Sequence, residues 1–515
     1  MGASPAFERN DSSSLEKADV GVMDLERSKD GSLHACAYAA EEDDTRGWKP
    51  TAEESAIEKK LKRKVDIFVL PVLTIVYLFN ALDKGNIGYA KTDTLVQDLH
   101  LKGQEYYLTT MIFYVPFCLC GVPLSLVIKR FSAARVLPIL MVGFGSISLL
   151  TCATTNFGGL MTLRLLLGIC ESPMLAGVVF YLSTFYTRNE LAGRVGIFYA
   201  AASISGAFSG LIAYGVFKID HPSVSSWKLL FVIEGAATIA FAIFAWFVLP
   251  RSVKTAKFLT PEEKTVAIKR IELNSSVSTD EKLDIRDAFR PFTDWRYAVW
   301  AAVSFTFGVP LVSVNTFLPQ IVARLGYDSL KTSLYTVAPN VVGTVFLVIV
   351  TQSSDHFRER GLHICGCVAL GLVGWIVLAL IDSANARANY GAMFLVTMGA
   401  FAPSVLTASW YSNNTAGESR RAVLAAVMVA IANSAGLVST NIFRTEWEPK
   451  YTPSLAITAT FSGLCLIITF CWTMYMRWDN KRRNYRLGTP KRRPQDVSTK
   501  ALALGAACEE FLWQP

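Results

Sequence analysis

The sequence predicts an all-α membrane protein with twelve transmembrane helices in two six-helix bundles. Of the 515 residues, 52% are apolar and only 18% are charged, which is too little polar surface for a soluble chain of this length. Twelve apolar runs have the length of about 20 residues that crosses a hydrocarbon core of roughly 30 Å. A charged connection separates the first six runs from the last six. These three observations define the fold class.

We interpret every run as a helix, because backbone groups in lipid must be satisfied within their own segment. The first six predicted spans are 66–88, 106–128, 135–153, 157–182, 193–217 and 228–250. The last six are 297–322, 332–352, 362–382, 389–411, 421–442 and 454–476. Six spans, a charged connection and six more spans are typical of two related bundles that face each other across a cavity.

The same pattern divides the chain into five consecutive segments. We expect a largely disordered cytoplasmic tail, an N-terminal bundle, a cytoplasmic connecting loop, a C-terminal bundle and a second cytoplasmic tail. In this order the segments are 1–62, 63–250, 251–296, 297–477 and 478–515. The first tail is rich in Ser, Asp and Glu, a composition that buries too little apolar surface to fold.

The connecting loop contains one readable element, "FLTPEEKTVAIKRIE" at 258–272. Thr260 as N-cap, Pro261 at the first helical position and Glu263 three residues after the cap form the pattern of a capping box. Apolar residues follow at helical spacing. We therefore expect an amphipathic surface helix that tethers the two bundles.

The distribution of Lys and Arg places both termini in the cytoplasm, since basic residues gather in cytoplasmic loops. The run "KKLKRK" at 59–64 precedes the first span, and a second basic group, 477–486, follows the last. This asymmetry accounts for the net charge of +8, so the expected partner is the lipid bilayer and no nucleic acid. We expect a multi-pass monomer in the plasma membrane.

Three stretches carry a resemblance to a known family. They are "YLFNALDKGNIGYAK" at 77–91, "RLLLGICES" with the following "YLSTFYTRNELAGR" between 164 and 194, and "ASWYSNNTAGESRRAV" at 408–423. With the short basic turns after the second and eighth spans, the chain resembles the major facilitator superfamily. Within it, the three stretches resemble the anion:cation symporter group and its fungal allantoate permease branch. The resemblance covers about 62–485 and implies a transporter with the major facilitator fold.

Charged residues inside the spans are candidate functional residues, because a charge at mid-bilayer costs at least about 2.5–3.5 kcal/mol. Arg164 and Glu171 lie seven residues apart, on one face of the fourth span. Asp83 and Lys84 lie in the outer half of the first span, about 100° apart around the helix. We expect Asp83 to pair with Arg164 and Lys84 to remain free to attract an anion. A purely structural role for Arg164 and Glu171 is the alternative.

The resemblance implies roles for these four residues. In the symporter group an acid and a basic residue in the first span face an Arg and a Glu in the fourth. There the Glu takes up the proton and the basic residues handle the carboxylate of the substrate. Asp83, Arg164 and Glu171 match this pattern, whereas Lys84 stands where Arg is commoner and lacks the planar fork that binds a carboxylate in bidentate fashion.

These residues predict proton-coupled uptake of a small organic anion by alternating access. Burial disfavours the charged form of Glu171, and its protonation would favour an anion beside Arg164. Tyr77, Asn80 and Asn315 are candidate cavity residues. The proton is the only coupling ion expected; no other cofactor and no metal site is predicted.

Charged residues at the cytoplasmic helix ends are candidates for gate salt bridges. They are Glu190, Arg194, Asp355, Arg358, Glu418 and Arg421. Solvated helix-end charges would show the same pattern.

Three function classes remain open. The first is a symporter for an anion of the allantoate, nicotinate or pantothenate type. The second is an exporter of a small acidic metabolite, and the third is a nutrient receptor that binds without cycling. An enzyme is not expected, because the sequence shows no nucleophile with a base, metal cluster or phosphate loop.

Overall fold

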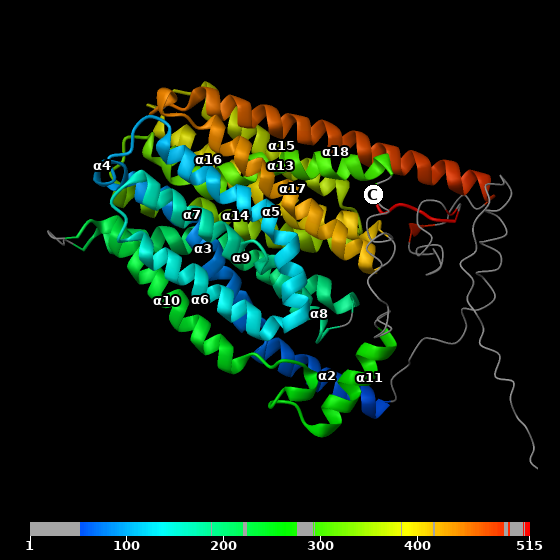
Figure 1. The fold of residues 1–515 in the computed structure, drawn as a ribbon. Helices are drawn as coiled ribbons and strands as arrows, with labels where there is room; N and C mark the ends of the chain where they lie inside the picture. Colours follow the sequence, from blue (N-terminus) through cyan, green and yellow to red (C-terminus); the bar gives the residue numbers. More distant parts are fainter. Residues whose placement is uncertain are drawn as a thin grey trace, which may run out of the picture. The chain divides into compact units, whose positions relative to one another are not determined.

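The computed structural model describes residues 52–186, 188–219, 224–274, 294–382, 384–415 and 418–488, with 292, 493–494, 508 and 510–515. The expected tail up to residue 51 and the part 275–291 of the connection lie outside the described residues. Within them the structure is all-helical (Figure 1). Eleven helices are long and apolar enough to cross a membrane, and a 27-residue helix occupies the place of the second predicted span. The predicted fold class is therefore confirmed.

The first half of the chain contains the helices of the first six predicted spans. They are α2 (Ala52–Phe68), α3 (Leu70–Thr92), α4 (Leu95–Asp98), α5 (Glu105–Phe131), α6 (Ala133–Thr151), α7 (Phe157–Glu171), α8 (Met174–Ser183), α9 (Arg188–Phe217) and α10 (Ser226–Val248). The fourth predicted span is two helices, since α7 ends at Glu171 and α8 begins after Pro173. A proline removes a backbone donor and interrupts the helix at this point.

The second half contains the remaining spans, after a short connecting segment. The connection has a 3₁₀ turn, η1 (Val253–Thr255), and α11 (Pro261–Asn274). The later elements are α13 (Trp295–Ala323), α14 (Ser329–Phe357), α15 (Gly361–Leu380), α16 (Ala386–Asn413), α17 (Glu418–Ile442), η3 (Thr445–Trp447) and α18 (Thr452–Arg486). The last helix runs ten residues beyond the predicted span.

The capping box predicted for the connection is present at the start of α11. The backbone N–H of Thr260 donates to Glu263 at 2.9 Å, and the backbone N–H of Glu263 donates to the Thr260 hydroxyl at 3.3 Å. Lys64 of α2 also pairs with Glu263 at 2.8 Å. The connection is thereby fixed to α2, which is helical from Ala52 although the sequence predicted a largely disordered segment up to residue 62.

Three helix pairs make the most extensive contacts between the two halves, and they position the site. The pairs are α9 with α14, α5 with α17 and α3 with α13. Gly88 permits the last of these, since a Cβ there would lie 2.4 Å from the carbonyl oxygen of Thr316. The start of α2, the end of α18 and α11 lie at one end of the bundle, here called the terminal side; α4 and the α17–α18 loop lie at the other (Figure 1).

The last residues of the chain pack against the second half on the terminal side. Phe511, Leu512 and Trp513 are buried. The indole N–H of Trp513 donates to Asp479 at 2.8 Å, and the carbonyl of Gln514 accepts from the indole N–H of Trp410 at 2.9 Å. The expected second cytoplasmic tail thus includes a docked C-terminal segment, which the sequence did not predict.

Candidate functional site

The central charges meet where α3 and α7 face each other, but in a different pairing from the expected one. The Lys84 ammonium lies 3.7 Å from a carboxylate oxygen of Glu171, whose side chain is fully buried. The same ammonium lies over the ring of Phe117, 4.4 Å from its centroid. The expectation that Lys84 would be free is therefore wrong, because it is the ion-pair partner of the proposed proton site.

Asp83 and Arg164 are both buried, yet no ion pair joins them among the described residues. One oxygen of Asp83 accepts a hydrogen bond from Ser148 at 2.9 Å, and the other has no partner among the described residues. The guanidinium of Arg164 lies 5.9 Å from the centroid of Phe231, and its Nη2 atom makes no hydrogen bond within the described part. The expected Asp83–Arg164 pair is corrected: each has an unused polar atom in the interior.

Glu234 of α10 is a further buried acid, which the sequence analysis overlooked. Its side chain is 2% exposed, and one of its oxygens accepts a hydrogen bond from the amide of Asn86 on α3. Its other oxygen has no partner among the described atoms. The signal was available, since Glu234 interrupts an apolar span just as Glu171 does. We call Asp83, Lys84, Arg164, Glu171 and Glu234 the central cluster.

The three candidate cavity residues occupy different environments. Asn80 is 1% exposed and its amide nitrogen has no partner among the described residues. Tyr77 is also buried, with its ring edge-on to Phe198 at 4.9 Å between centroids. Asn315 is exposed on α13. Tyr77 and Asn80 therefore lie on the helix of Asp83 and Lys84, whereas Asn315 belongs to the other half.

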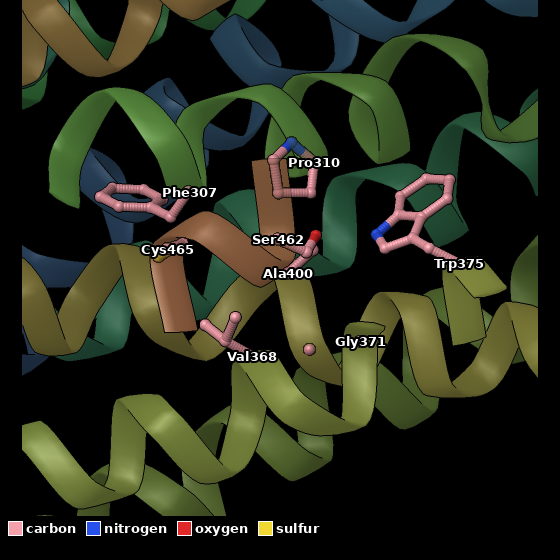
Figure 2. A pocket seen from close by; sticks show the side chains of 9 residues that line it. Phe307, Pro310, Val368, Gly371, Trp375, Ala400, Ser462 and Cys465 are labelled. Carbon is pink, nitrogen blue, oxygen red and sulfur yellow. The ribbon is translucent and has the colours of Figure 1, made fainter. Parts of the chain in front are cut away.

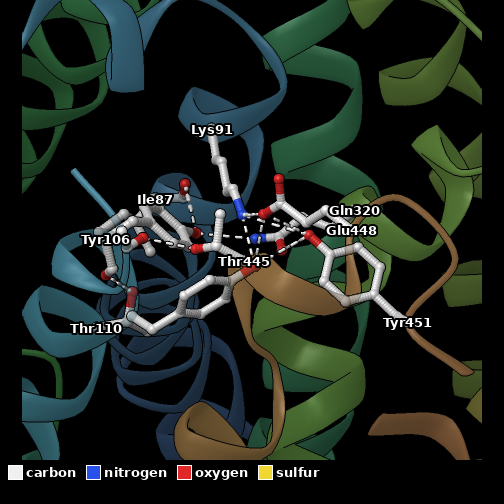
Figure 3. A network of polar contacts seen from close by, with 10 residues as sticks. Ile87, Lys91, Tyr106, Thr110, Gln320, Thr445, Glu448 and Tyr451 are labelled. Carbon is white, nitrogen blue, oxygen red and sulfur yellow. Dashed lines mark hydrogen bonds and ion pairs between the residues drawn. The ribbon is translucent and has the colours of Figure 1, made fainter. Parts of the chain in front are cut away.

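A polar network joins the two halves at the end opposite the terminal side (Figure 3). Lys91 of α3 pairs with Glu448 of the α17–α18 loop, with 2.5 Å between the ammonium and the carboxylate oxygen. Glu448 also accepts hydrogen bonds from the hydroxyls of Tyr107 and Tyr451, each at 2.9 Å. The network continues to Tyr106, which accepts a 2.9 Å hydrogen bond from the amide of Gln320. We call Lys91, Tyr106, Tyr107, Gln320, Glu448 and Tyr451 the polar seal.

The gate residues predicted in the first half find partners within that half. Arg194 binds both oxygens of Asp66, at 3.0 and 2.9 Å. The hydroxyl of Tyr186 donates to Asp66 at 2.6 Å. Glu190 forms an ion pair with Lys62. These contacts fix α9 to α2, and their role as a gate stays a prediction.

The gate residues predicted in the second half also find local partners. Asp355 pairs with Arg360, while Arg358 is exposed in a left-handed conformation at φ 54°. Arg421 donates to the carbonyl of Thr415 at 3.1 and 2.9 Å. The side chain of Glu418 lies outside the described residues. Asp355 therefore has an arginine partner two residues beyond Arg358, and the role of these residues as a gate stays a prediction.

A small cavity lies within the second half, between α13, α15, α16 and α18 (Figure 2). Its lining is mostly apolar and includes Phe307, Pro310 and Trp375. The cavity measures about 10 Å³, the lower limit for a single water. An organic anion does not fit it, so the central cluster remains the candidate site.

The twelve-helix fold with a charged, buried centre defines a multi-pass membrane transporter. Residues 73–440 match the Major Facilitator Superfamily, and the chain belongs to this superfamily, which is one of transporters.

Fungal relatives cover nearly the whole chain. The MFS-type transporter efuF of Hormonema carpetanum is 48% identical over 448 residues, which are 87% of this chain and 91% of that protein. The major facilitator-type transporter hxnP of Emericella nidulans is 41% identical over 463 residues, 89% of this chain and 93% of that protein.

Among solved structures, the fold is similar to that of a bacterial homologue of the human lysosomal transporter Spinster, in an inward-facing and unoccupied conformation. The TM-score is 0.62 at 16% identity, with 83% of this chain and 98% of that chain covered. The likeness shows a shared fold.

Proposed function

We propose that this protein is a proton-coupled symporter for a small organic anion, such as a monocarboxylate of the allantoate, nicotinate or pantothenate type. The observation that carries the proposal is the contact between Lys84 and the fully buried side chain of Glu171, because it would join a proton site directly to an anion site. The resemblance of "YLFNALDKGNIGYAK" and "RLLLGICES" to the fungal allantoate permease branch supports the same substrate class.

The Lys84–Glu171 contact supplies a coupling mechanism. While Glu171 is ionised, it neutralises Lys84 and competes with any other carboxylate. A proton on Glu171 removes this competitor and frees the ammonium for the substrate. Arg164, whose Nη2 atom has no hydrogen-bond partner in the described part of the chain, provides the second positive group. Proton binding and anion binding therefore favour each other, and by linkage the effect is reciprocal.

The charge of the central cluster supports a monoanion as substrate. The cluster holds three carboxyl groups, of Asp83, Glu171 and Glu234, but only two cations, Lys84 and Arg164. Burying an uncompensated charge is costly, so the empty cluster is neutral only when one carboxyl holds a proton. Neither Asp83 nor Glu234 has a cationic contact among the described residues. We assign that proton to Glu234, because Arg164 stabilises the charge of Asp83 through space and no cation does so for Glu234. A second proton, on Glu171, then leaves one positive charge, which matches one monocarboxylate.

The polar seal supports alternating access. With both termini in the cytoplasm and the protein in the plasma membrane, as we propose, the polar seal closes the extracellular side. Lys91 and Tyr107 belong to the first half, and Glu448 and Tyr451 to the second, so the halves cannot part at this end until these contacts break. Asp66–Arg194 and Asp355–Arg360 each hold elements within one half, and neither pair spans the two halves.

Uptake into a permease-deficient yeast tests the proposal. Cells expressing the protein receive radiolabelled monocarboxylates, nicotinate and allantoate among them, at acidic and at neutral external pH. The wild type is expected to accumulate one of them at acidic pH, and the accumulation should collapse with an uncoupler and in Glu171→Gln. The control is Glu446→Gln, an exposed carboxylate in the α17–α18 loop. Faster loss of acid from preloaded cells, without uptake, would instead assign the protein to export.

A further inference from the structure

Lys91 is a desolvated cation whose hydrogen-bonding capacity is fully used. Its ammonium contacts the carboxylate of Glu448 at 2.5 Å and the hydroxyls of Tyr107 and Tyr451 at 2.6 and 3.3 Å. An ammonium has three donors, so these three acceptors saturate it. The rings of Tyr106 and Tyr107 add cation–π contacts, at 4.6 and 4.3 Å to the centroids. Lys91 thus lies in a tyrosine cage completed by one carboxylate.

The carboxylate and the cation differ in accessibility. The side chain of Glu448 is 35% exposed, whereas that of Lys91 is 12% exposed. Glu448 therefore stands between the solvent and the buried cation. It belongs to the loop between η3 and α18 rather than to a long helix, so it can leave without moving a span. Removing it without a replacement would leave Lys91 buried and unpaired, which is strongly unfavourable.

We infer that Lys91 is an entry site for the carboxylate of the transported anion. When the polar seal is closed, the carboxylate of Glu448 occupies this site in place of the anion. This inference rests on the proposed function. An incoming carboxylate takes the place of Glu448 on the ammonium, and Glu448 moves into water. The charge of Lys91 stays paired throughout. Because Glu448 also holds Tyr107 and Tyr451, its departure releases the contact between the two halves, and the anion opens the polar seal itself.

The two partners of this ion pair should affect affinity in opposite directions. Glu448→Gln removes the competitor and should lower the KM for radiolabelled nicotinate, or for allantoate, several-fold. Lys91→Gln removes the anion site and should raise the same KM about tenfold or more, the effect of losing one hydrogen bond to a charged group. Lys91→Arg keeps the charge and should recover a KM near that of the wild type. If the Lys91–Glu448 pair only held the two halves together, Glu448→Gln and Lys91→Gln would shift the KM in the same direction.

Matched controls and a folding check keep the outcome decisive. Glu446→Gln and Lys450→Gln change exposed residues of the same loop and should leave the KM unchanged. The amount of protein at the membrane and its melting temperature in detergent are measured for every variant. If Lys91→Gln fails to reach the membrane, Glu448→Gln and Lys91→Arg decide the question. If the KM shifts in the same direction in Glu448→Gln and Lys91→Gln, or shifts in neither, Lys91 is not an entry site. The proposed function still holds in that case, provided that the wild type takes up the anion with protons. Absence of any proton-linked uptake by the wild type would overturn the proposed function instead.

Discussion

Trp513 should hold the C-terminal segment on the second half, and Trp513→Ala should release it. The side chain is 4% exposed. Its indole N–H donates to Asp479 at 2.8 Å, and its backbone exchanges two hydrogen bonds with Asn480, both at 2.8 Å. Its ring lies 4.9 Å from that of Phe511 and 5.3 Å from the guanidinium of Arg296. Truncation therefore removes a buried indole that packs against Phe511 and a hydrogen bond to a carboxylate.

The magnitude follows from the buried area. A tryptophan buries about 150–250 Å², which at about 25 cal/mol per Å² is worth roughly 4–6 kcal/mol. Measured Trp→Ala losses in cores are about 3–5 kcal/mol. Because the segment can detach instead of leaving a cavity, its own docking free energy limits the loss. We therefore expect a loss at the lower end of this range, about 3 kcal/mol in docking, or roughly a hundredfold shift toward the released segment.

Hydrogen exchange of residues 510–515 in purified protein measures this release. The wild type should protect the backbone N–H groups of Trp513 and Gln514, and Trp513→Ala should exchange them at least tenfold faster. Trp478→Ala is the control, since Trp478 lies on α18 near the docked segment but is 55% exposed. Unchanged protection in Trp513→Ala, or equal loss in Trp478→Ala, would refute the assignment of docking energy to Trp513.

Three further predictions concern the polar seal, the central cluster and the connection. Burial alone would raise the pKa of Glu448, but the charge of Lys91 and the hydrogen bonds that the carboxylate receives lower this pKa below its usual value. The stability that Glu448 adds is therefore fully present above the usual pKa that it has in the unfolded chain, and is lost as pH falls from there through the lowered pKa of the folded protein. The melting-temperature difference between wild type and Glu448→Gln should stay constant down to about pH 5 and shrink below it, and a difference that already shrinks at neutral pH would contradict this. Infrared spectra at neutral pH should show a protonated carboxyl that Glu234→Gln removes and Glu446→Gln keeps; identical spectra would argue against a proton on Glu234. Thr260→Ala should cost about 1 kcal/mol by loss of the cap, measured as earlier thermal release of α11 from α2, and an unchanged melting curve would show that Lys64–Glu263 alone fixes this helix.

The fold could be predicted from the sequence because the lipid bilayer restricts what a membrane span can be. Each span must be long, apolar and helical, and such runs are visible without knowledge of packing. The capping box at Thr260 was equally readable, because all of its contacts lie within four residues. The break after Glu171 could also be expected at Pro173, since the proline acts on its own helix.

The ion pair between Lys84 and Glu171 could not be predicted in the same way. Helical geometry showed that Asp83 and Lys84 point about 100° apart, but it could not tell which of them faces α7. That choice depends on how α3 is rotated and shifted against its neighbours, which is fixed by packing of the whole bundle. Glu234 could have been found by applying the rule for intramembrane charges to every span. Its partner Asn86 carries no charge, so no sequence rule singled out the contact.

Contacts between distant segments were the least predictable. Lys91 and Glu448 are separated by 357 residues, and each lies where a solvated charge is ordinary. The docked end of the chain is similar, because its few apolar residues show no periodicity. The indole N–H of Trp410, 104 residues away in sequence, donates to the backbone of this segment.

The most direct test of the account measures proton and anion movement together in liposomes that contain the purified protein. With a pH gradient, the wild type should accumulate radiolabelled nicotinate or allantoate while protons enter with it. Glu171→Gln keeps Lys84 permanently free, so it should still exchange labelled for unlabelled anion but should lose accumulation driven by the gradient. If Glu171→Gln accumulates the anion as the wild type does, or if the wild type moves the anion without protons, Glu171 is not the residue that couples them.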